Sequence, residues 1–258
     1  MKIDSYKLEI CANSVASCIE AQKGGAYRVE LCAGIPEGGT TPSYGDMVMA
    51  RESLKECKLN VIIRPRGGDF LYSSLEQKIM LHDIEMARKT GVDGVVIGCL
   101  TAEGEIDMIR NRELMDAAGD LPVTFHRAFD MTRNPFESLE KIIELSCARI
   151  LTSGQKPTAE EGIELIAQLV EKAGERIIIM PGSGVNLNNI EKLAVATGAQ
   201  EFHMSGRKSI LSDMKFRNPN VSMGGTNITI PEYERLITDD ELVSKVVSKL
   251  SAMNKNQN

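Results

Sequence analysis

The chain has 258 residues but no tryptophan, and aromatic residues make up only 4% of it. Sites that bind bases by stacking need aromatic faces, so this composition disfavours such a site. The net charge is −6, and lysine and arginine are scattered rather than gathered in a basic stripe. We therefore expect no nucleic-acid partner.

Long hydrophobic runs are also missing. No apolar run approaches the ~20 residues of a membrane-spanning helix, and Met1–Tyr6 lack the apolar core of a signal peptide. These absences predict a cytoplasmic protein without a membrane partner. The six cysteines show no CxxC pair and no zinc-ribbon spacing, which favours free thiols over a disulfide framework; they are Cys11, Cys18, Cys32, Cys57, Cys99 and Cys147.

The chain does contain eight short apolar runs, each followed by polar or glycine-rich residues and a helix-like stretch. The ends of successive runs are 21 to 34 residues apart, the size of one strand–helix unit. Eight such units predict a single-domain α/β protein with a (β/α)8 TIM-barrel fold over residues 1–258. The runs are Lys7–Cys11, Tyr27–Cys32, Asn60–Arg64, Gly94–Gly98, Pro122–His126, Arg149–Thr152, Arg176–Met180 and Glu201–Met204.

The last part of the chain does not show this regular spacing of apolar runs. From about residue 214 to 258 we expect a C-terminal extension with a terminal helix, which is a candidate contact surface. In a barrel of this kind the chemistry lies at the carboxyl ends of the strands, so the candidate residues are sought there.

The first two strands end alike, in Glu9-Ile10-Cys11 and Glu30-Leu31-Cys32. Side chains alternate along a strand, so each glutamate shares a side with its cysteine. On adjacent strands, two thiols and two carboxylates would meet at one rim, and two thiolates suit a soft ion such as Cu(I). The alternative is that both cysteines are small buried apolar residues.

Arg64 and Arg66 flank a proline at the end of the third strand, where their planar guanidinium groups would suit a carboxylate or phosphate. The alternative is a structural ion-pair network with Glu9 or Glu30. His126 and His203 lie at the ends of the fifth and eighth strands and are candidates for a base, an acid or a metal ligand, or for a structural role.

Glycine-rich loops follow the seventh and eighth strands, where barrels often bind phosphate through backbone N–H groups. They predict an anion site built from Gly182, Ser183, Gly184, Ser205, Gly206 and Arg207. Tight turns are the alternative. The segment Gly34–Ser43 is predicted either as a lid over the mouth or as an ordered turn before a helix.

Several long stretches resemble the CutC family, the so-called copper homeostasis proteins. They include Val29–Cys32, Glu37–Ser43, Ile63–Phe70, Val123–Met131 and Leu151–Gln155. The resemblance implies a cytoplasmic (β/α)8 barrel, often oligomeric, with a link to copper through Cys11 and Cys32. Leu71 stands where some members carry cysteine, so a third thiol ligand is not expected there.

Two functions stay open, beside a purely structural mouth. One is Cu(I) binding, nearly linear, by Cys11 and Cys32. The other is an enzyme of unassigned reaction on a small phosphorylated or carboxylated metabolite, with Glu30 or His126 as the acid–base residue. The expected partners are thus a copper ion or a small anion, and further copies of the chain in a dimer or tetramer.

Overall fold

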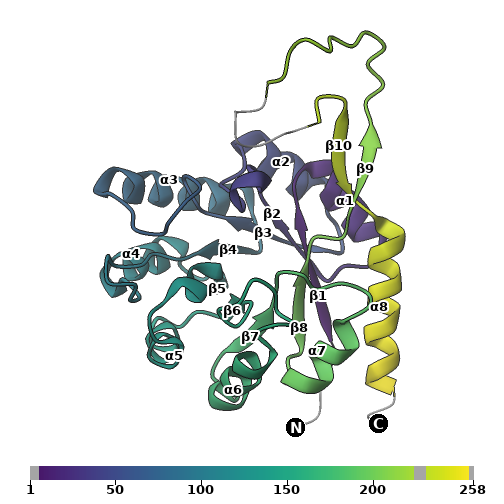
Figure 1. Ribbon diagram of the computed structural model, residues 1–258. Coiled ribbons are helices and arrows are strands. Elements are labelled where there is room, and N and C mark those ends of the chain that lie inside the picture. Colours follow the sequence, from purple (N-terminus) through teal and green to yellow (C-terminus); the bar gives the residue numbers. More distant parts are fainter. Residues whose placement is uncertain (1–5, 224–230, 256–258) are drawn as a thin grey trace.

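The computed structural model describes residues 6–223 and 231–255. Eight parallel strands pair in the order β7-β6-β5-β4-β3-β2-β1-β8. The end strands β7 and β8 contact each other, so the sheet curls into a nearly closed barrel (Figure 1). The predicted (β/α)8 TIM barrel is confirmed. The strands are β1 (Lys7–Ala12), β2 (Arg28–Leu31), β3 (Lys58–Ile62), β4 (Gly94–Ile97), β5 (Val123–Phe125), β6 (Arg149–Thr152), β7 (Ile178–Pro181) and β8 (Glu201–Met204).

Each strand overlaps a predicted apolar run, and the ends differ by at most two residues. The reason is burial on both faces, since a parallel barrel strand packs against helices outside and side chains inside. In β4, for example, all four residues of Gly94–Ile97 are buried. The apolar runs therefore mark the strands without the alternation of a half-exposed sheet.

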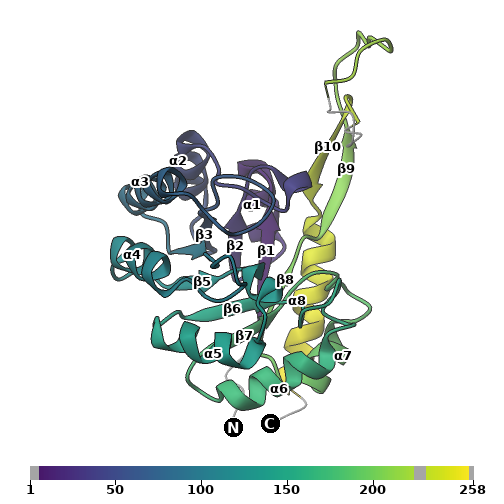
Figure 2. The same ribbon diagram turned by 60° about the vertical axis from the view of Figure 1, so that its left-hand side comes forward.

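Eight helices surround the sheet in a ring, as Figures 1 and 2 show from two sides. They are α1 (Val15–Lys23), α2 (Tyr44–Ser53), α3 (Ser74–Thr90), α4 (Met108–Ala118), α5 (Pro135–Glu144), α6 (Ile163–Ala173), α7 (Ile190–Thr197) and α8 (Asp240–Lys255). Capping fixes their ends: Ser73 and Glu76 form a capping box before α3, and Gly91 ends it with a φ of 76°. No helix within the described ranges is long and apolar enough to cross a membrane.

The terminal helix α8 packs against α1, α7 and β1, so it fills the gap between the last and first helices of the ring. It is thus part of the barrel wall. The division of the chain at about residue 214 stays a prediction, and residues 224–230 and 256–258 of that segment lie outside the described chain.

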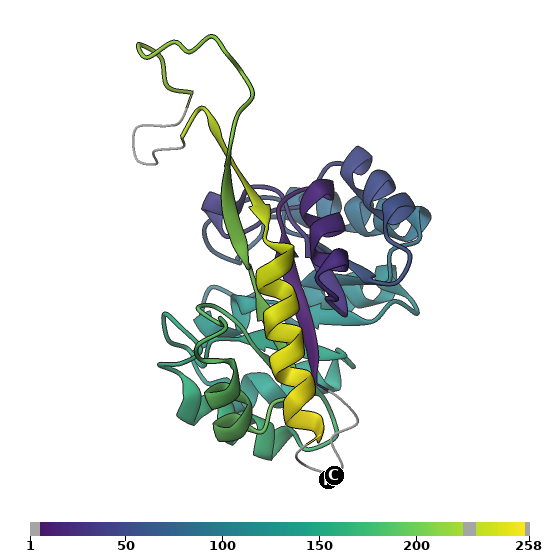
Figure 3. The ribbon, with the colours of Figure 1, turned by 90° about the vertical axis from the view of Figure 1, so that its right-hand side faces the viewer.

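A two-stranded antiparallel hairpin separates β8 from α8. It consists of β9 (Arg207–Leu211) and β10 (Glu234–Thr238), which pair from Arg207 with Thr238 to Leu211 with Glu234. Figure 3 shows it projecting from the barrel as an arm. Several large apolar side chains on this arm are exposed: Leu211, Met214, Phe216, Val221, Met223 and Leu236.

Candidate metal and anion site at the barrel mouth

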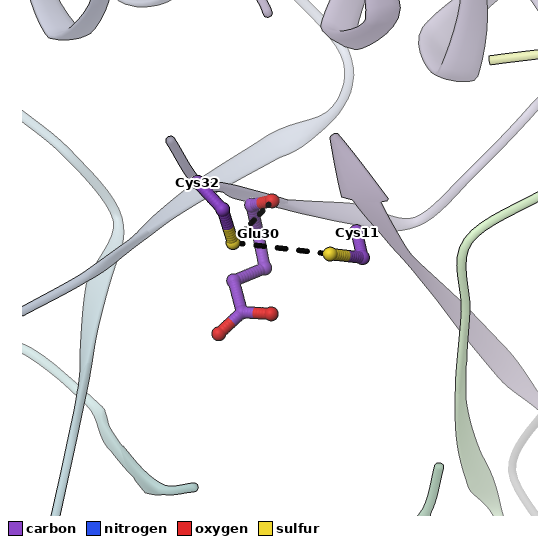
Figure 4. A group of neighbouring side chains, drawn as sticks. All are labelled: Cys11, Glu30 and Cys32. Atoms are coloured by element: carbon purple, nitrogen blue, oxygen red, sulfur yellow. Dashed lines mark hydrogen bonds between the residues drawn. The ribbon is translucent and has the colours of Figure 1, made fainter. Parts of the chain in front are cut away.

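The register of β1 and β2 brings two thiols and a carboxylate together. Cys11 is paired with Glu30, and Cys32 lies two residues further along β2 on the same side. The two sulfur atoms are 3.8 Å apart (Figure 4). Both sulfurs and a Glu30 carboxylate oxygen all lie within 4.8 Å of one another. The structure therefore places these three side chains as metal ligands would be placed, while their role stays a prediction.

Cationic groups surround the Cys11 sulfur. The Nη2 atom of Arg207 is 3.4 Å from it. The hydrogen bond from the Cys32 thiol, together with His203 and Arg207, holds the pKa of Cys11 well below its usual value despite burial. The same thiol–thiol hydrogen bond, with burial, raises the pKa of Cys32. The pair is thus a Cys11 thiolate that accepts a hydrogen bond from a Cys32 thiol.

His203 lies between two glutamates. Its Nδ1 atom is 2.8 Å from Glu9 and its Nε2 atom is 3.6 Å from Glu30. Burial opposes its charge, but Cys11, Glu9 and Glu30 raise the pKa of His203 well above its usual value. Burial likewise opposes the charge of Glu9, but Arg28 and His203 lower the pKa of that carboxyl. His203 is therefore an imidazolium at neutral pH.

Glu30 differs from Glu9 in its protonation state. Burial raises the pKa of Glu30 to about 8, so its carboxyl group is largely protonated at neutral pH. Its Oε1 atom is buried and has no hydrogen-bond partner within the described part of the chain. A buried polar atom without a partner in a cavity wall marks a place where a ligand would complete the hydrogen bonding.

His126 caps a short 3-10 turn, Arg127–Met131, that follows β5. Its Nδ1 atom accepts a hydrogen bond of 3.2 Å from the backbone N–H of Ala128, so the ring proton lies on Nε2. Burial and then the charge of Arg64 lower the pKa of His126 to about 3. At neutral pH this histidine is therefore neutral and can donate a hydrogen bond from Nε2. The acid–base role predicted for His126 stays a prediction.

The two arginines after β3 have different surroundings from those predicted. Arg64 donates to the carbonyl oxygens of Glu37, Gly39 and Gly68, at 2.8 Å each, and so holds the glycine-rich loops together. Arg66 pairs with Glu76 and Asp69 and lines neither cavity at the mouth. The alternative pairing of these arginines with Glu9 or Glu30 is not found among the described residues.

The segment Gly34–Ser43 is an ordered turn that also borders the mouth. A 3-10 turn, Ile35–Glu37, lies between Gly34 and Gly38, whose φ angles of 52° and 88° favour glycine. Ser43 then caps α2. Gly38 lines both cavities at the mouth. The segment is thus the predicted ordered turn before a helix, and it also borders the mouth as the predicted lid would.

Two cavities adjoin at the mouth and share Cys11, Gly38, Arg127 and His203. The inner cavity, about 270 Å³, is also lined by Glu30, Cys32, Arg64, Phe70 and His126. The outer cavity, about 540 Å³, is also lined by Ser183, Gly184, Ser205 and Arg207. The two predicted thiols and five of the eight predicted anion residues therefore line these adjoining cavities. The five are Arg64, Ser183, Gly184, Ser205 and Arg207.

Gly182 and Gly206 shape the loops rather than line the cavities. A Cβ atom on Gly182 would lie 2.4 Å from Leu151 Cδ1, so a larger residue there would force the Leu151 side chain to move. Gly206 has a φ of 50°, which again favours glycine. Both help to place the residues that follow them.

A buried ion-pair network below the mouth was missed by the sequence reasoning. Arg28 contacts Glu9, and its Nη2 atom lies 2.6 Å from Glu201, which in turn is 3.1 Å from Arg149 Nε. The sequence alternation could have revealed Arg28. Side chains two residues apart share one side of a strand, so Arg28 lies on the same side of β2 as Glu30 and faces the barrel interior with it. This network fixes the carboxylate of Glu9 against His203.

These features define a (β/α)8 barrel with a dithiol, a carboxyl group and an imidazolium at the carboxyl ends of its strands. Residues 6–208 match the model of the CutC family. A CutC family protein of Bacteroides thetaiotaomicron is 60% identical over 247 residues, covering 96% of this chain and 99% of that protein. The chain belongs to the CutC family.

Solved structures agree with this assignment. One, named as a candidate copper homeostasis protein CutC from Streptococcus agalactiae, superimposes with a TM-score of 0.75 at 37% identity, covering 78% of this chain and 98% of that one. A thiamine phosphate pyrophosphorylase from Pyrococcus furiosus superimposes with a TM-score of 0.60 at 15% identity and covers 96% of each chain. The second similarity concerns the fold alone.

Proposed function

We propose that this protein binds Cu(I) at the barrel mouth through Cys11 and Cys32, as part of copper homeostasis in the cytoplasm. The observation that carries the proposal is the pair of sulfur atoms 3.8 Å apart in the wall of an open cavity. Thiolate sulfur selects soft ions such as Cu(I) over hard cations. The name of the Streptococcus relative points to the same metal.

The spacing of the sulfurs fits one shared ion. Two metal–thiolate bonds of ~2.3 Å span at most ~4.6 Å when they are in line, so the sulfurs would separate by about 0.8 Å from their present 3.8 Å for linear binding. Without that movement the ion would sit off the line between them, toward the Glu30 carboxylate. Glu30 is therefore a neighbour of the ion, and its carboxyl group, largely protonated at neutral pH, adds no charge to the site.

The charges of the site favour a monovalent ion. Two thiolates and one Cu(I) ion carry a net charge of −1, which Arg207 beside Cys11 would balance. His203 is already engaged by Glu9 and lies near Glu30, so it supports the site instead of binding the metal. Binding displaces the proton of the Cys32 thiol, so affinity should increase with pH.

The test is a titration of the reduced, metal-free protein with Cu(I) against a competing chelator. We expect one ion per chain, and we expect the Cys11→Ser/Cys32→Ser double variant to lose that binding. Cys57→Ala is the matched control, because burial raises the pKa of this distant thiol to about 12. Equal affinity in wild type and double variant, or a preference for Zn(II) over Cu(I), would contradict the proposal.

We further propose that the chain forms a dimer or tetramer, with the arm of β9 and β10 as the contact surface. The exposed apolar side chains of that arm support this part of the proposal. The acid–base roles of Glu30 and His126 in an enzyme reaction stay predictions.

A further inference from the structure

The outer cavity has the composition of an anion site. Its described lining residues include Arg127 and Arg207 but no aspartate or glutamate. Arg127 is partly neutralised, because its Nε atom lies 2.8 Å from Asp130. The Nε atom of Arg207, in contrast, is buried and has no hydrogen-bond partner in the described chain. Arg207 therefore has a donor left for a ligand.

Two loops border this cavity from the ends of β7 and β8. Ser183 and Gly184 both have a φ of 72°, so the first loop turns sharply at the cavity wall. The side chain of Ser183 donates to the carbonyl oxygen of Pro157 and Asn186 donates to that of Gly184, which holds the loop in place. A fixed loop with backbone N–H groups beside an arginine suits a tetrahedral anion with several acceptor oxygens.

The inner cavity presents polar atoms of a different kind. His126 is only 4% exposed, and its Nε2 atom has no partner in the described chain although the ring lines the cavity. The other side of the ring is pressed against Gly98, where an added Cβ atom would lie 2.6 Å from Nδ1. The ring is therefore held in place, and its buried Nε2–H is a donor that no described residue uses. Glu30 Oε1 is a second unpartnered buried atom in the same wall.

The size of the inner cavity limits what these atoms can bind. Its volume is about 270 Å³, close to the lower end, roughly 300 Å³, of the range found for small-molecule pockets. Phe70 and Leu151 supply apolar wall, and the polar atoms are few and fixed. This combination is typical of a pocket for one small organic molecule.

We propose that the mouth binds a small phosphorylated polyol or sugar, with its phosphate beside Arg207 in the outer cavity and its hydroxyl-bearing carbon chain beside His126 in the inner cavity. The two cavities adjoin and share four lining residues, so one molecule placed across their common wall would reach both groups of partners. This site shares Arg207 and part of its wall with the dithiol, but neither cysteine is one of its binding groups, and it is tested in the metal-free protein. It therefore stands or falls separately from Cu(I) binding.

The test uses calorimetric titration of the reduced, metal-free protein with three probes: inorganic phosphate, ribose and ribose 5-phosphate. We expect ribose 5-phosphate to bind at least tenfold more tightly than either fragment. Arg207→Gln should weaken phosphate and ribose 5-phosphate about tenfold or more, because a charge-assisted hydrogen bond is lost. Arg235→Gln is the matched control, since Arg235 is an exposed arginine on the partner strand β10.

The inner cavity is tested with His126→Phe, which removes the Nε2–H donor and keeps a ring. It should weaken ribose 5-phosphate severalfold and leave inorganic phosphate unchanged. Should this variant not fold, the wild-type protein labelled with ¹⁵N-histidine replaces it: ribose 5-phosphate shifts the His126 Nε2 signal, and exposed His82 serves as the internal control. Failure of phosphate and ribose 5-phosphate to bind, equal affinity for both, or indifference to Arg207→Gln would overturn the proposal.

Discussion

The Nη2 atom of Arg207, the first residue of the arm strand β9, lies 3.4 Å from the sulfur of Cys11 on the barrel strand β1. The base of the arm and the dithiol are thus in direct contact. A cation at this distance stabilises a thiolate more than a thiol, so Arg207 contributes to the reactivity of Cys11.

Replacing Arg207 should therefore make Cys11 less reactive. In Arg207→Gln the pKa of Cys11 rises, since a positive charge beside the thiolate is lost, and alkylation at pH 7 slows. The rate is measured with iodoacetamide, and mass spectrometry identifies the modified cysteine. Lys208→Gln is the control, because Lys208 pairs with Asp239 and Asp240. An unchanged rate in Arg207→Gln would show that the arginine does not affect the thiolate.

The buried network predicts a stability change with a defined pH dependence. Burial opposes the charge of Glu201, but Arg28 and Arg149 lower its pKa below the ordinary 4.5. A lowered carboxyl pKa stabilises the fold above pH 4.5, and this contribution is lost as the pH falls through the folded-state value. Glu201→Gln should thus lower the free energy of unfolding by about 3–5 kcal/mol at pH 7, because buried Arg149 loses its carboxylate and buried Arg28 loses one of two.

Denaturant unfolding at several pH values measures this effect. The difference between wild type and Glu201→Gln should shrink as the pH falls below 4.5. Glu164→Gln, at an exposed site on α6, is the control and should change little. A difference that stays constant down to pH 3 would mean that Glu201 is not paired as an anion.

His126 predicts a second, separate pH dependence. Its folded-state pKa of about 3 is below the ordinary 6.5, so between these values the unfolded chain binds a proton that the folded chain does not. Stability therefore falls as the pH drops from 6.5 toward 3, by up to about 1.4 kcal/mol per pH unit from this group. His126→Phe should flatten the pH profile in that range. The exposed His82→Gln should retain the wild-type profile, and a profile that is identical in all three proteins would refute the assignment.

The arm makes a prediction about assembly. Leu211 and Phe216 are 68% and 72% exposed, and burying them against another chain would remove apolar surface from water. The double variant Leu211→Ser/Phe216→Ser should have a lower mass by light scattering than the wild-type protein, for which we propose a dimer or tetramer. Val195→Ser, at a 76% exposed site on α7, is the control. Equal masses for wild type and double variant would contradict the proposal that this arm is a contact surface.

The strands and the rim of the site were predictable, because both depend on local patterns. Apolar runs mark buried strands, and the shared alternation of Glu9 with Cys11 and of Glu30 with Cys32 places these side chains inside the barrel. The hydrogen-bond and ion-pair partners of these side chains were not predictable, because they come from strands and loops far away in the sequence. Arg64 was predicted to bind an anion, with pairing to Glu9 or Glu30 as the alternative. It donates to loop carbonyls, and Glu9 is paired with Arg28 and His203.

The hairpin was missed for a related reason. Arg207–Leu211 has charged and polar residues beside apolar ones and is mostly exposed, so it lacks the apolar run by which the barrel strands were found. The hairpin matters for the site because its first residue, Arg207, lies beside the dithiol. Arg207 was predicted as an anion-binding residue, and only the fold shows that it also contacts Cys11.

The order of these residues along the chain has a consequence for how the site matures. Cys11 and Cys32 are translated first, whereas His203 and Arg207 belong to the last quarter of the chain. Strand β1 has no β8 beside it until then, and Cys11 lacks His203 and Arg207, which contribute to its lowered pKa. In a ribosome-bound fragment the dithiol therefore lacks both cations, and its full surroundings form only when the barrel closes.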